Sequence, residues 1–488
     1  MLGKNEAFNR TTARSIKLLL LVVFICIFML KNLAASEINF AKREVENNDD
    51  QGDNDDNHCE NDGDDDSCDV SGKQPHIVVV LIDDAGWNDV GWNNDFMPTP
   101  VLNELAYNGV ILNNMYAQPL CTPSRIALLT GRYPAKVDMQ HSVVLPSQPY
   151  YLPSEYSTLA NKLKEVGYMN HVVGKWNIGS CNWTYTPLWR GFDSHYGCYE
   201  ATISDYETHM LNWPPNRQPP LFTGIEFRDN TGVVTHQNGT HNTFLFTERA
   251  EKIVRNHNPS SPLFLYVAYM IPHFPLQVPA GFEESVQVDD ADRKIVGGMM
   301  AAIDQGVGNI TQALKDTGIW DDTLFVFLSD NGGDDLFAGS NYPYRGNKAS
   351  TFEGGMKVPA FFHGSMLQDP STMNNELYHF TDVFATLVSV AGGELDQWFR
   401  PAENPSAPIP DVPLITENEN NRFLFNLKDD PLETNNLYYD PDEQNVVIEI
   451  EQRLEEYRAS ISPIWYPDEL DPRSDPAKFG GFWTPGWC

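Results

Sequence analysis

The chain contains a continuous apolar run, HIVVVLIDD at residues 76–84, that ends in two carboxylates. A strand that is buried on both faces of a parallel sheet has this pattern, because helices cover both of its sides. Similar strands are expected at residues 169–175, 262–270 and 323–331. Helices are expected between them, at residues 99–110, 158–166, 244–255 and 291–317. This alternation predicts an α/β fold in which a large mixed, mostly parallel sheet is sandwiched by helices.

Polar residues stand at the C-terminal ends of these expected strands: Asp83, Asp84, Lys175, His273, Asp330 and Asn331. Ligands of open α/β sheets bind beyond the carboxyl ends of the strands, so the sequence brings these groups to one edge. A single Asp after a strand is usually a turn or a helix cap, but two such pairs on separate strands favour a metal site. The Asp and Asn ligands are oxygens, and the sequence has no His/Cys cluster with zinc spacing. The expected ion is therefore Ca²⁺ or Mg²⁺.

Cys121 opens the segment CTPSRIALLTGRYP. One hypothesis is a nucleophilic thiolate, with a pKa lowered by Arg125 and by a following helix. A soft thiolate is a poor match for a hard, carboxylate-bound cation, however, and an oxygen species at this position would fit better. A lone cysteine is more often buried or disulfide-bonded, but that interpretation leaves the surrounding motif unexplained.

The run C-T-P-S-R followed by A-L-L-T-G-R resembles the sulfatase signature, in which the cysteine is oxidised in the endoplasmic reticulum to formylglycine. Five further motifs occur in the family's order: DDAGWNDVG (83–91), GKWNIG (174–179), PHFPLQVP (272–279), SDNGG (329–333) and GNKASTFEGGMKVP (346–359). They are similar to the arylsulfatase B branch, and the resemblance covers roughly residues 75–393. It implies an alkaline phosphatase-like fold and the hydrolysis of sulfate esters of a glycan or an aryl sulfate. The formylglycine-generating enzyme would be a partner during maturation.

The resemblance also implies a role for each site residue. One Ca²⁺ per chain would be bound by Asp83, Asp84, Asp330, Asn331 and an oxygen of residue 121. Arg125 would hold the modified residue, and Lys175 and Lys348 would bind the sulfate oxygens. His273 would protonate or orient the departing alkoxide. One hydroxyl of the hydrated formylglycine would attack sulfur, and the second would lose its proton to release sulfate.

Asn177 departs from the family pattern, which has His after Gly-Lys-Trp. An amide cannot accept a proton at useful pH, so a candidate general base is missing. His171 or His195 could replace it. A catalytically impaired sulfatase that binds sulfated glycans is the alternative function. A phosphate-ester hydrolase is a further hypothesis, but such relatives use Thr or Ser with zinc, which Cys121 and the oxygen ligands do not match.

The rest of the chain suggests a secreted, multi-part organisation. Residues 1–36 are expected to be a signal peptide, with an uncleaved membrane anchor as the alternative, because a basic stretch precedes thirteen apolar residues at 18–30. Residues 37–73 are expected to be an acidic, disordered segment. The net charge of −34 argues against nucleic-acid binding. Residues 74–393 would form the catalytic domain, and residues 394–488 a small, shortened C-terminal α+β domain.

Cysteines and glycosylation sequons fit the same route. Sequons occur at Asn182, Asn238 and Asn309. The expected location is the secretory pathway, ending in the lysosome or outside the cell. Cysteine spacing suggests two disulfides, Cys181–Cys198 and Cys59–Cys68, which would leave Cys488 unpaired.

Overall fold

The computed structural model describes residues 73–200, 204–214, 219–396, 422–463, 465–467 and 470–488. The expected leader, the acidic segment and the Cys59–Cys68 pair lie outside these residues. Within the described part, no helix combines the length and the apolar character needed to cross a bilayer.

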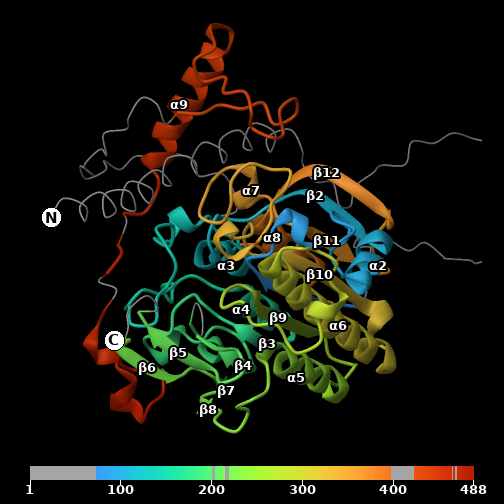
Figure 1. Cartoon of the computed structure of the whole chain (residues 1–488), viewed down its shortest axis with the longest axis vertical. Helices are drawn as coiled ribbons and strands as arrows, with labels where there is room; N and C mark the ends of the chain where they lie inside the picture. Colours follow the sequence, from blue (N-terminus) through green and yellow to red (C-terminus); the bar gives the residue numbers. More distant parts are fainter. Residues whose placement is uncertain (1–72, 201–203, 215–218, 397–421, 464, 468–469) are drawn as a thin grey trace, which may run out of the picture.

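A ten-stranded sheet forms the centre of the molecule (Figure 1). Its order is β12 (Thr372–His379), β2 (Val110–Tyr116), β11 (Ala360–His363), β10 (Thr323–Ser329), β1 (His76–Asp83), β9 (Leu263–Pro272), β3 (Met169–Lys175), β4 (Ser194–Cys198), β7 (Arg228–Asp229) and β8 (Gly232–Val233). The strands from β10 through β4 pair in parallel, and β11, β7 and β8 run antiparallel to their neighbours. The predicted large, mixed and mostly parallel sheet is confirmed.

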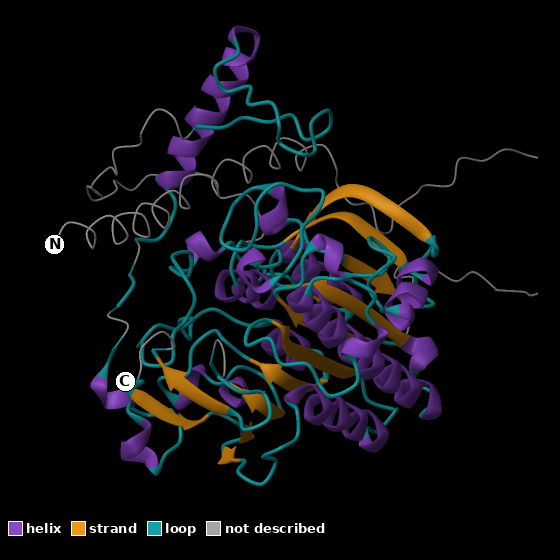
Figure 2. Cartoon of the chain, in the orientation of Figure 1, coloured by secondary structure: helices purple, strands orange, loops and turns teal. Residues whose placement is uncertain are grey.

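Helices cover both faces of this sheet (Figure 2). One face packs against α2 (Pro100–Asn108), α5 (Asn242–Asn256) and α6 (Ala291–Asp316). The other face packs against α3 (Cys121–Thr130), α4 (Leu159–Glu165) and α8 (Phe380–Val390). Successive residues of β1 alternate between the two hydrophobic clusters, so the strand is fully buried. This double burial explains why its sequence is uniformly apolar.

The four predicted helices and the predicted strands are present, with small differences at their ends. Thr158 caps α4 by accepting a hydrogen bond from the backbone N–H of Asn161, and Asp290 caps α6 in the same way through Arg293. Such caps satisfy N–H groups that have no partner inside the helix. Strand β9 is longer than expected and runs to Pro272, so His273 follows its last residue directly.

Described residues of the C-terminal region form helix α9 (Gln444–Arg458). It packs with a small hydrophobic cluster of its own that includes Leu424 and Tyr438. After α9 the chain descends along the left side of Figure 1 and ends beside β6 (Phe222–Ile225), which pairs with β5 (Met210–Trp213). The backbone N–H of Trp483 donates to the carbonyl of Ile225, so the tail is attached to the main body.

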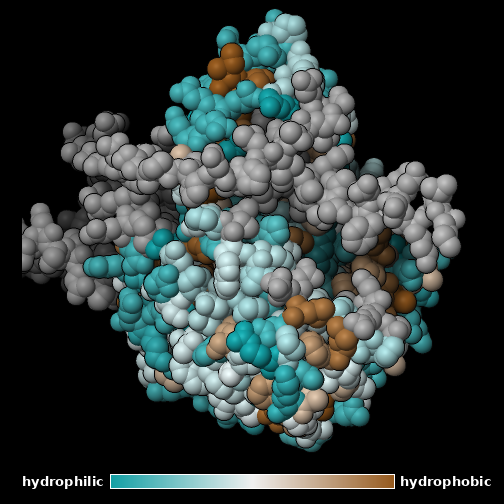
Figure 3. Space-filling view, turned by 90° about the vertical axis from the view of Figure 1, so that its left-hand side faces the viewer, coloured by the Kyte–Doolittle hydropathy of each residue, from teal (hydrophilic) through white to brown (hydrophobic). Residues whose placement is uncertain are grey.

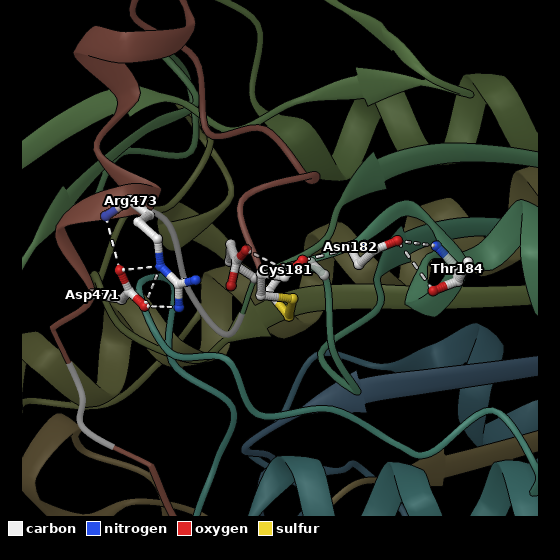
Figure 4. Close-up of a disulfide and its surroundings, with 8 residues drawn as sticks. Cys181, Asn182, Thr184, Asp471 and Arg473 are labelled. Carbon is white, nitrogen blue, oxygen red and sulfur yellow. Dashed lines mark hydrogen bonds and ion pairs between the residues drawn. A yellow bond between two sulfur atoms is a disulfide. The ribbon is translucent and has the colours of Figure 1, made fainter.

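One predicted disulfide is wrong: Cys181 pairs with Cys488 and not with Cys198 (Figure 4). Cys198 ends β4, where it is buried and its thiol donates to the carbonyl oxygen of Glu226 at 3.0 Å. The C-terminal tail reaches Cys181 instead, and the N–H of Gly486 donates to the Cys181 carbonyl at 2.8 Å. Pairing therefore follows the packing of the tail, which cysteine spacing does not encode.

Candidate active site

Four oxygen-bearing residues converge where β1 and β10 end. Asp83 is the last residue of β1, Asp84 follows it, and Asp330 and Asn331 follow the neighbouring parallel strand β10. The backbone N–H of Asp84 donates to Oδ1 of Asp330 at 3.2 Å, and Nδ2 of Asn331 donates to Oδ1 of Asp84 at 2.8 Å. All four residues are buried. The structure thus brings the predicted metal ligands together.

Cys121 lies against this carboxylate cluster. It is the first residue of α3, and its Sγ is 3.4 Å from Oδ1 of Asp83 and 4.0 Å from Oδ1 of Asp84. Burial, together with the charge of Asp330, raises the pKa of the Cys121 thiol well above its usual value. An unmodified Cys121 therefore stays protonated at neutral pH, which argues against the thiolate hypothesis.

Three cationic side chains neutralise the three carboxylates. The N–O distances are 2.6–2.8 Å in the pairs Lys175–Asp83, Lys348–Asp84 and Arg125–Asp330. Burial by itself raises the pKa of Asp84, but the charges of Lys348 and His273 outweigh it and leave this pKa lowered. Against burial, the charge of Lys175 likewise leaves the pKa of Asp83 lowered, whereas burial and the charge of Asp83 raise the pKa of Asp330.

His273 turns one ring nitrogen toward the cluster. Its Nδ1 lies 2.6 Å from the carbonyl oxygen of Phe274, which can only accept, so Nδ1 carries a hydrogen. Its Nε2 lies 3.7 Å from Oδ2 of Asp84. Burial, assisted by the charge of Lys348, lowers the pKa of His273. The imidazole therefore faces the cluster through Nε2.

Asn177 sits beside the cysteine segment in a left-handed conformation, with φ of 59°. The hydroxyl of Thr122, next to Cys121, donates to Oδ1 of Asn177 at 2.9 Å. The Asn177 amide in turn donates to the carbonyl of Val144 at 3.2 Å. Both ends of the amide therefore have neutral partners, and this side chain supports the segment that carries Cys121.

His171 and His195 do not replace the missing histidine. His171 is the third residue of β3, and His195 pairs with Val172 in the strand register. Lys175 is the last residue of the same strand. It lies three residues beyond Val172, or about 10 Å along the strand. Both histidines therefore lie toward the opposite edge of the sheet.

The donor set of this cluster fits a hard divalent cation. Ligand atoms of Asp83, Asp84, Cys121 and His273 all lie within 4.8 Å of one another. Oδ1 of Asn331 is buried without a hydrogen-bond partner, which is costly unless another group binds it. Carboxylate and amide oxygens are the ligands that Ca²⁺ prefers. A thiol is not, so an oxygen on residue 121 would complete the set better than sulfur.

The family model that describes sulfatases matches residues 75–393. The chain belongs to the sulfatase family. It is therefore a sulfuric ester hydrolase by family, and the predicted enzyme class is confirmed. Arylsulfatase J of Mus musculus is 33% identical over 488 residues, covering 84% of this chain and 80% of that protein. N-acetylgalactosamine-6-sulfatase of the same species is 32% identical over 333 residues, covering 65% of this chain and 62% of that protein.

A solved structure shows the same fold. The crystal structure of Ps i-CgsB in complex with k-i-k-neocarrahexaose has a TM-score of 0.69 and 24% sequence identity, and the match covers 81% of this chain and 95% of that one. The α/β architecture predicted from the sequence is thereby confirmed. Assignment to the arylsulfatase B branch remains a prediction.

Sequence reasoning missed a tyrosine that holds the turn carrying His273. The hydroxyl of Tyr206 lies 2.7 Å from the carbonyl oxygen of His273, 3.1 Å from that of Met270 and 3.0 Å from that of Phe274. Tyr206 is fully buried, so this hydroxyl and the turn fix each other's position. No motif marks this tyrosine, because its partners lie more than sixty residues away.

The C-terminal region also contacts the loop that carries Lys348. Oε2 of Glu433 accepts a hydrogen bond of 2.8 Å from the backbone N–H of Glu353, the first residue of the short helix α7 (Glu353–Met356). The guanidinium of Arg345 donates to the carbonyl of Glu433 at 3.0 Å and stacks over Phe352. The loop between Arg345 and Glu353 is therefore held at both ends by one C-terminal residue.

Proposed function

We propose that this sulfatase hydrolyses sulfate esters of a glycan, and of small aryl sulfates, with formylglycine at position 121 and one bound Ca²⁺. The observation that carries this proposal is the arrangement around Cys121. Carboxylates, lysines, an arginine and a histidine from separate strands and loops surround a single buried side chain. Such a site suits the transfer of a negatively charged group.

In this proposal Asp83, Asp84, Asp330 and Asn331 hold the Ca²⁺. The ion, when bound, supplies positive charge beside the reacting oxygen. Three carboxylates and three cationic side chains balance one another among the described residues of the site. A divalent cation therefore leaves the site with excess positive charge, which complements a sulfate ester.

The two lysines then become available to the substrate. Lys175 and Lys348 pair with Asp83 and Asp84, and both ammonium groups would bind sulfate oxygens if these carboxylates also held the ion. Formylglycine at residue 121 would add water to give a gem-diol, in which one hydroxyl is the nucleophile and the second loses its proton when sulfate is released and the aldehyde re-forms. Arg125, which donates to Asp330 and to the carbonyl of Lys175, keeps the base of the site in place.

His273 is the residue placed to handle the proton of the leaving group. Its Nε2 faces the cluster while its Nδ1 is committed to a carbonyl. Because Nδ1 holds the hydrogen of the neutral ring and burial lowers the pKa of His273, Nε2 would donate to a departing alkoxide only in the imidazolium form, as general acid catalysis requires. Asn177 cannot take a proton, so this chain lacks the base that the family pattern places after Gly-Lys-Trp.

The names of similar proteins support a glycan substrate. One relative is an N-acetylgalactosamine-6-sulfatase, and one similar structure contains an oligosaccharide. The basic and apolar leader, the sequons and the Cys181–Cys488 disulfide support passage through the secretory pathway to the lysosome or the outside of the cell. There the formylglycine-generating enzyme would modify Cys121. A sulfated glycan and that enzyme are thus the proposed partners.

Mass spectrometry of the peptide containing residue 121 tests the proposal, after expression in cells that make formylglycine. The modified protein should release 4-nitrophenol from 4-nitrophenyl sulfate in the presence of Ca²⁺ and should leave 4-nitrophenyl phosphate largely intact. Unmodified Cys121 would contradict the proposed nucleophile. Modified protein that binds sulfated oligosaccharides without turning them over would favour the impaired, glycan-binding alternative.

A further inference from the structure

A surface pocket of about 440 Å³ lies apart from the residues of the catalytic centre. Four aromatic side chains line it: Tyr150, Tyr151, Tyr185 and Trp465. The carboxylates of Asp138 and Glu155 are also part of its wall. Its volume falls within the range of pockets that bind small molecules. Neither the carboxylate cluster nor the sulfate-binding lysines use it, so it needs an explanation of its own.

The aromatic side chains of the wall pack against one another. The rings of Tyr151 and Tyr185 are stacked, with centroids 3.6 Å apart and planes within 10°. Trp465 meets the rings of Tyr150 and Tyr151 edge to face at 6.2 and 6.1 Å. The Tyr150 hydroxyl donates to the backbone carbonyl of Asp138 at 2.6 Å. A flat apolar surface that is already ordered binds at a low entropic cost.

Trp465 belongs to the segment that follows α9 down the left side of Figure 1, and its side chain is 48% exposed. Figure 3 views the molecule from that side: where the surface is coloured it is mostly pale or teal, with brown patches near the top, at the right and in the lower half. An exposed tryptophan beside ordered tyrosines on a largely hydrophilic face is typical of a binding surface, because it combines apolar area with polar surroundings.

The charged residues that line the pocket are acidic, and the hydroxyl groups of Ser154, Tyr151 and Tyr185 can donate or accept. Oδ1 of Asp138 accepts the backbone N–H of Trp465 at 2.8 Å, and Glu155 is exposed. Arg190 lies behind the loop, but it donates to the carbonyl oxygens of Leu152, Pro153 and Tyr156 and is buried. Asp138 and Glu155 are therefore the charged residues among those that line the pocket, and both are acidic. A sulfate group would be repelled, whereas hydroxyl groups would donate to these carboxylates.

The pocket is connected to the segment that carries the catalytic lysine. The backbone N–H of Leu152 donates to the carbonyl of Ile178 at 2.9 Å, and the indole N–H of Trp176 donates to the carbonyl of Tyr185 at 2.9 Å. Gly179 packs directly on Tyr151, where a Cβ would lie 2.4 Å from the tyrosine Cβ. The wall of the pocket and the turn after Lys175 thus form one packed unit.

We infer that this pocket binds an unsulfated, uncharged sugar unit of the glycan substrate. The C–H face of a pyranose ring would pack on Trp465 and the tyrosine stack, and its hydroxyls would donate to Asp138 and Glu155. The choice of a sugar rests on the proposed function, whereas the preference for an uncharged unit follows from the carboxylates alone. Selection of glycans with unsulfated units beside sulfated ones would follow from this second contact.

Isothermal titration with neoagarohexaose and with N-acetylchitohexaose tests the inference on the full protein, because both probes are neutral oligosaccharides. Wild-type protein should bind at least one of them. Trp465→Ala should weaken binding about tenfold or more, because the aromatic face is lost. Glu155→Gln, which changes an exposed side chain, should weaken it less and without loss of folding. Trp189→Ala is the matched control, since Trp189 is also 48% exposed.

The outcomes separate this inference from the proposed function. Hydrolysis of 4-nitrophenyl sulfate should be the same in wild type and Trp465→Ala, because this small substrate does not reach the pocket. Active wild-type protein that binds neither hexasaccharide, or binds it equally well after Trp465→Ala, would overturn the inference alone. Saturable binding of tetramethylammonium that is lost in Trp465→Ala would also overturn it, by showing a cation site. Sugar binding without sulfatase activity would contradict only the proposed function.

Discussion

Nζ of Lys348 lies 2.6 Å from Oδ2 of Asp84, within a group of carboxylates and cations that is almost wholly buried. A buried carboxylate needs such a partner, because an isolated charge is expensive to remove from water. Burial opposes the charge of Lys348, but the charges of the neighbouring carboxylates raise its pKa above the usual value for a lysine. The pair therefore keeps both groups ionised.

Calcium should stabilise the protein through this cluster. A ligand present at a hundred times its Kd raises the free energy of unfolding by about 2.7 kcal/mol. We expect CaCl₂ to raise the melting temperature of wild type, and EGTA to reverse the rise, in differential scanning fluorimetry. Asp330→Asn should lose most of this Ca²⁺-dependent increment. Asp369→Asn, which removes an exposed carboxylate elsewhere, should keep all of it.

An equal Ca²⁺-dependent increment in Asp330→Asn and in wild type would contradict this assignment. The size of the increment is the relevant quantity, because Asp330→Asn also breaks the pair with Arg125 and lowers the starting melting temperature. Activity toward 4-nitrophenyl sulfate should fall with EGTA in parallel with the loss of stabilisation. Recovery of both after Ca²⁺ is restored would link the two effects to one site.

Replacing Asn177 by histidine should restore a general base. Positioned bases contribute about 10²–10⁴-fold to rate, so we expect Asn177→His to raise kcat toward 4-nitrophenyl sulfate by up to about 10²-fold. Histidine tolerates the left-handed backbone of this position better than most residues, which favours folding of the variant. The pH profile of kcat should gain a new limb near the pKa of a histidine.

Asn177→Gln provides the comparison, because it also breaks the bond from the Thr122 hydroxyl but adds no base. A similar loss of activity in both variants would show that the amide acts as a partner of Thr122. In that case this chain would need the short amide at residue 177 for activity, and the absence of a base there would not lower its rate.

The sequence predicted the parts of the molecule that local patterns determine. The apolar run of β1 predicted that this strand is buried on both faces, and the carboxylates directly after it predicted the position of the site. Both predictions depend only on consecutive residues. The disulfide of Cys181 was predicted wrongly, since it depends on where the last residues of the chain pack. Tyr206 and Glu433 act through partners far away in the sequence, and a tyrosine or glutamate in a loop has no pattern that reveals such a role.

Tyr206→Phe should impair catalysis by loosening the turn that carries His273. Loss of one buried hydroxyl that bonds three carbonyl groups costs about 1–3 kcal/mol of stability. We expect kcat to fall about tenfold and the pH dependence of kcat to shift, because Nε2 of His273 is no longer fixed. Tyr269→Phe is the control: its hydroxyl is equally buried but bonds Thr247 at 2.7 Å, away from the site. Equal effects of both variants on kcat would show that Tyr206 has only a structural role.

Stability should depend on pH through the contact between Glu353 and Glu433. Burial raises the pKa of Glu353 to about 7 and that of Glu433 to about 8, where the charge of Glu353 adds to the shift. Both values exceed the ordinary glutamate value of 4.5, so the folded protein binds more protons than the unfolded chain between these limits. This stabilising contribution is therefore complete below pH 4.5 and is lost as the pH rises through 7 to 8.

This contribution can be measured from melting temperatures at about pH 5 to 8.5, the range in which Glu353 and Glu433 are expected to lose their protons. We expect Glu433→Gln to flatten the decline, because an amide keeps the hydrogen bond from the Glu353 backbone at every pH. Glu376→Gln, which changes an exposed glutamate, should leave the decline as in wild type. If the Glu433→Gln and wild-type curves are parallel, these two carboxyls do not titrate together in the folded protein. If the two curves converge at acidic pH, an acidic compartment stabilises the contact between Glu433 and the loop that carries Lys348.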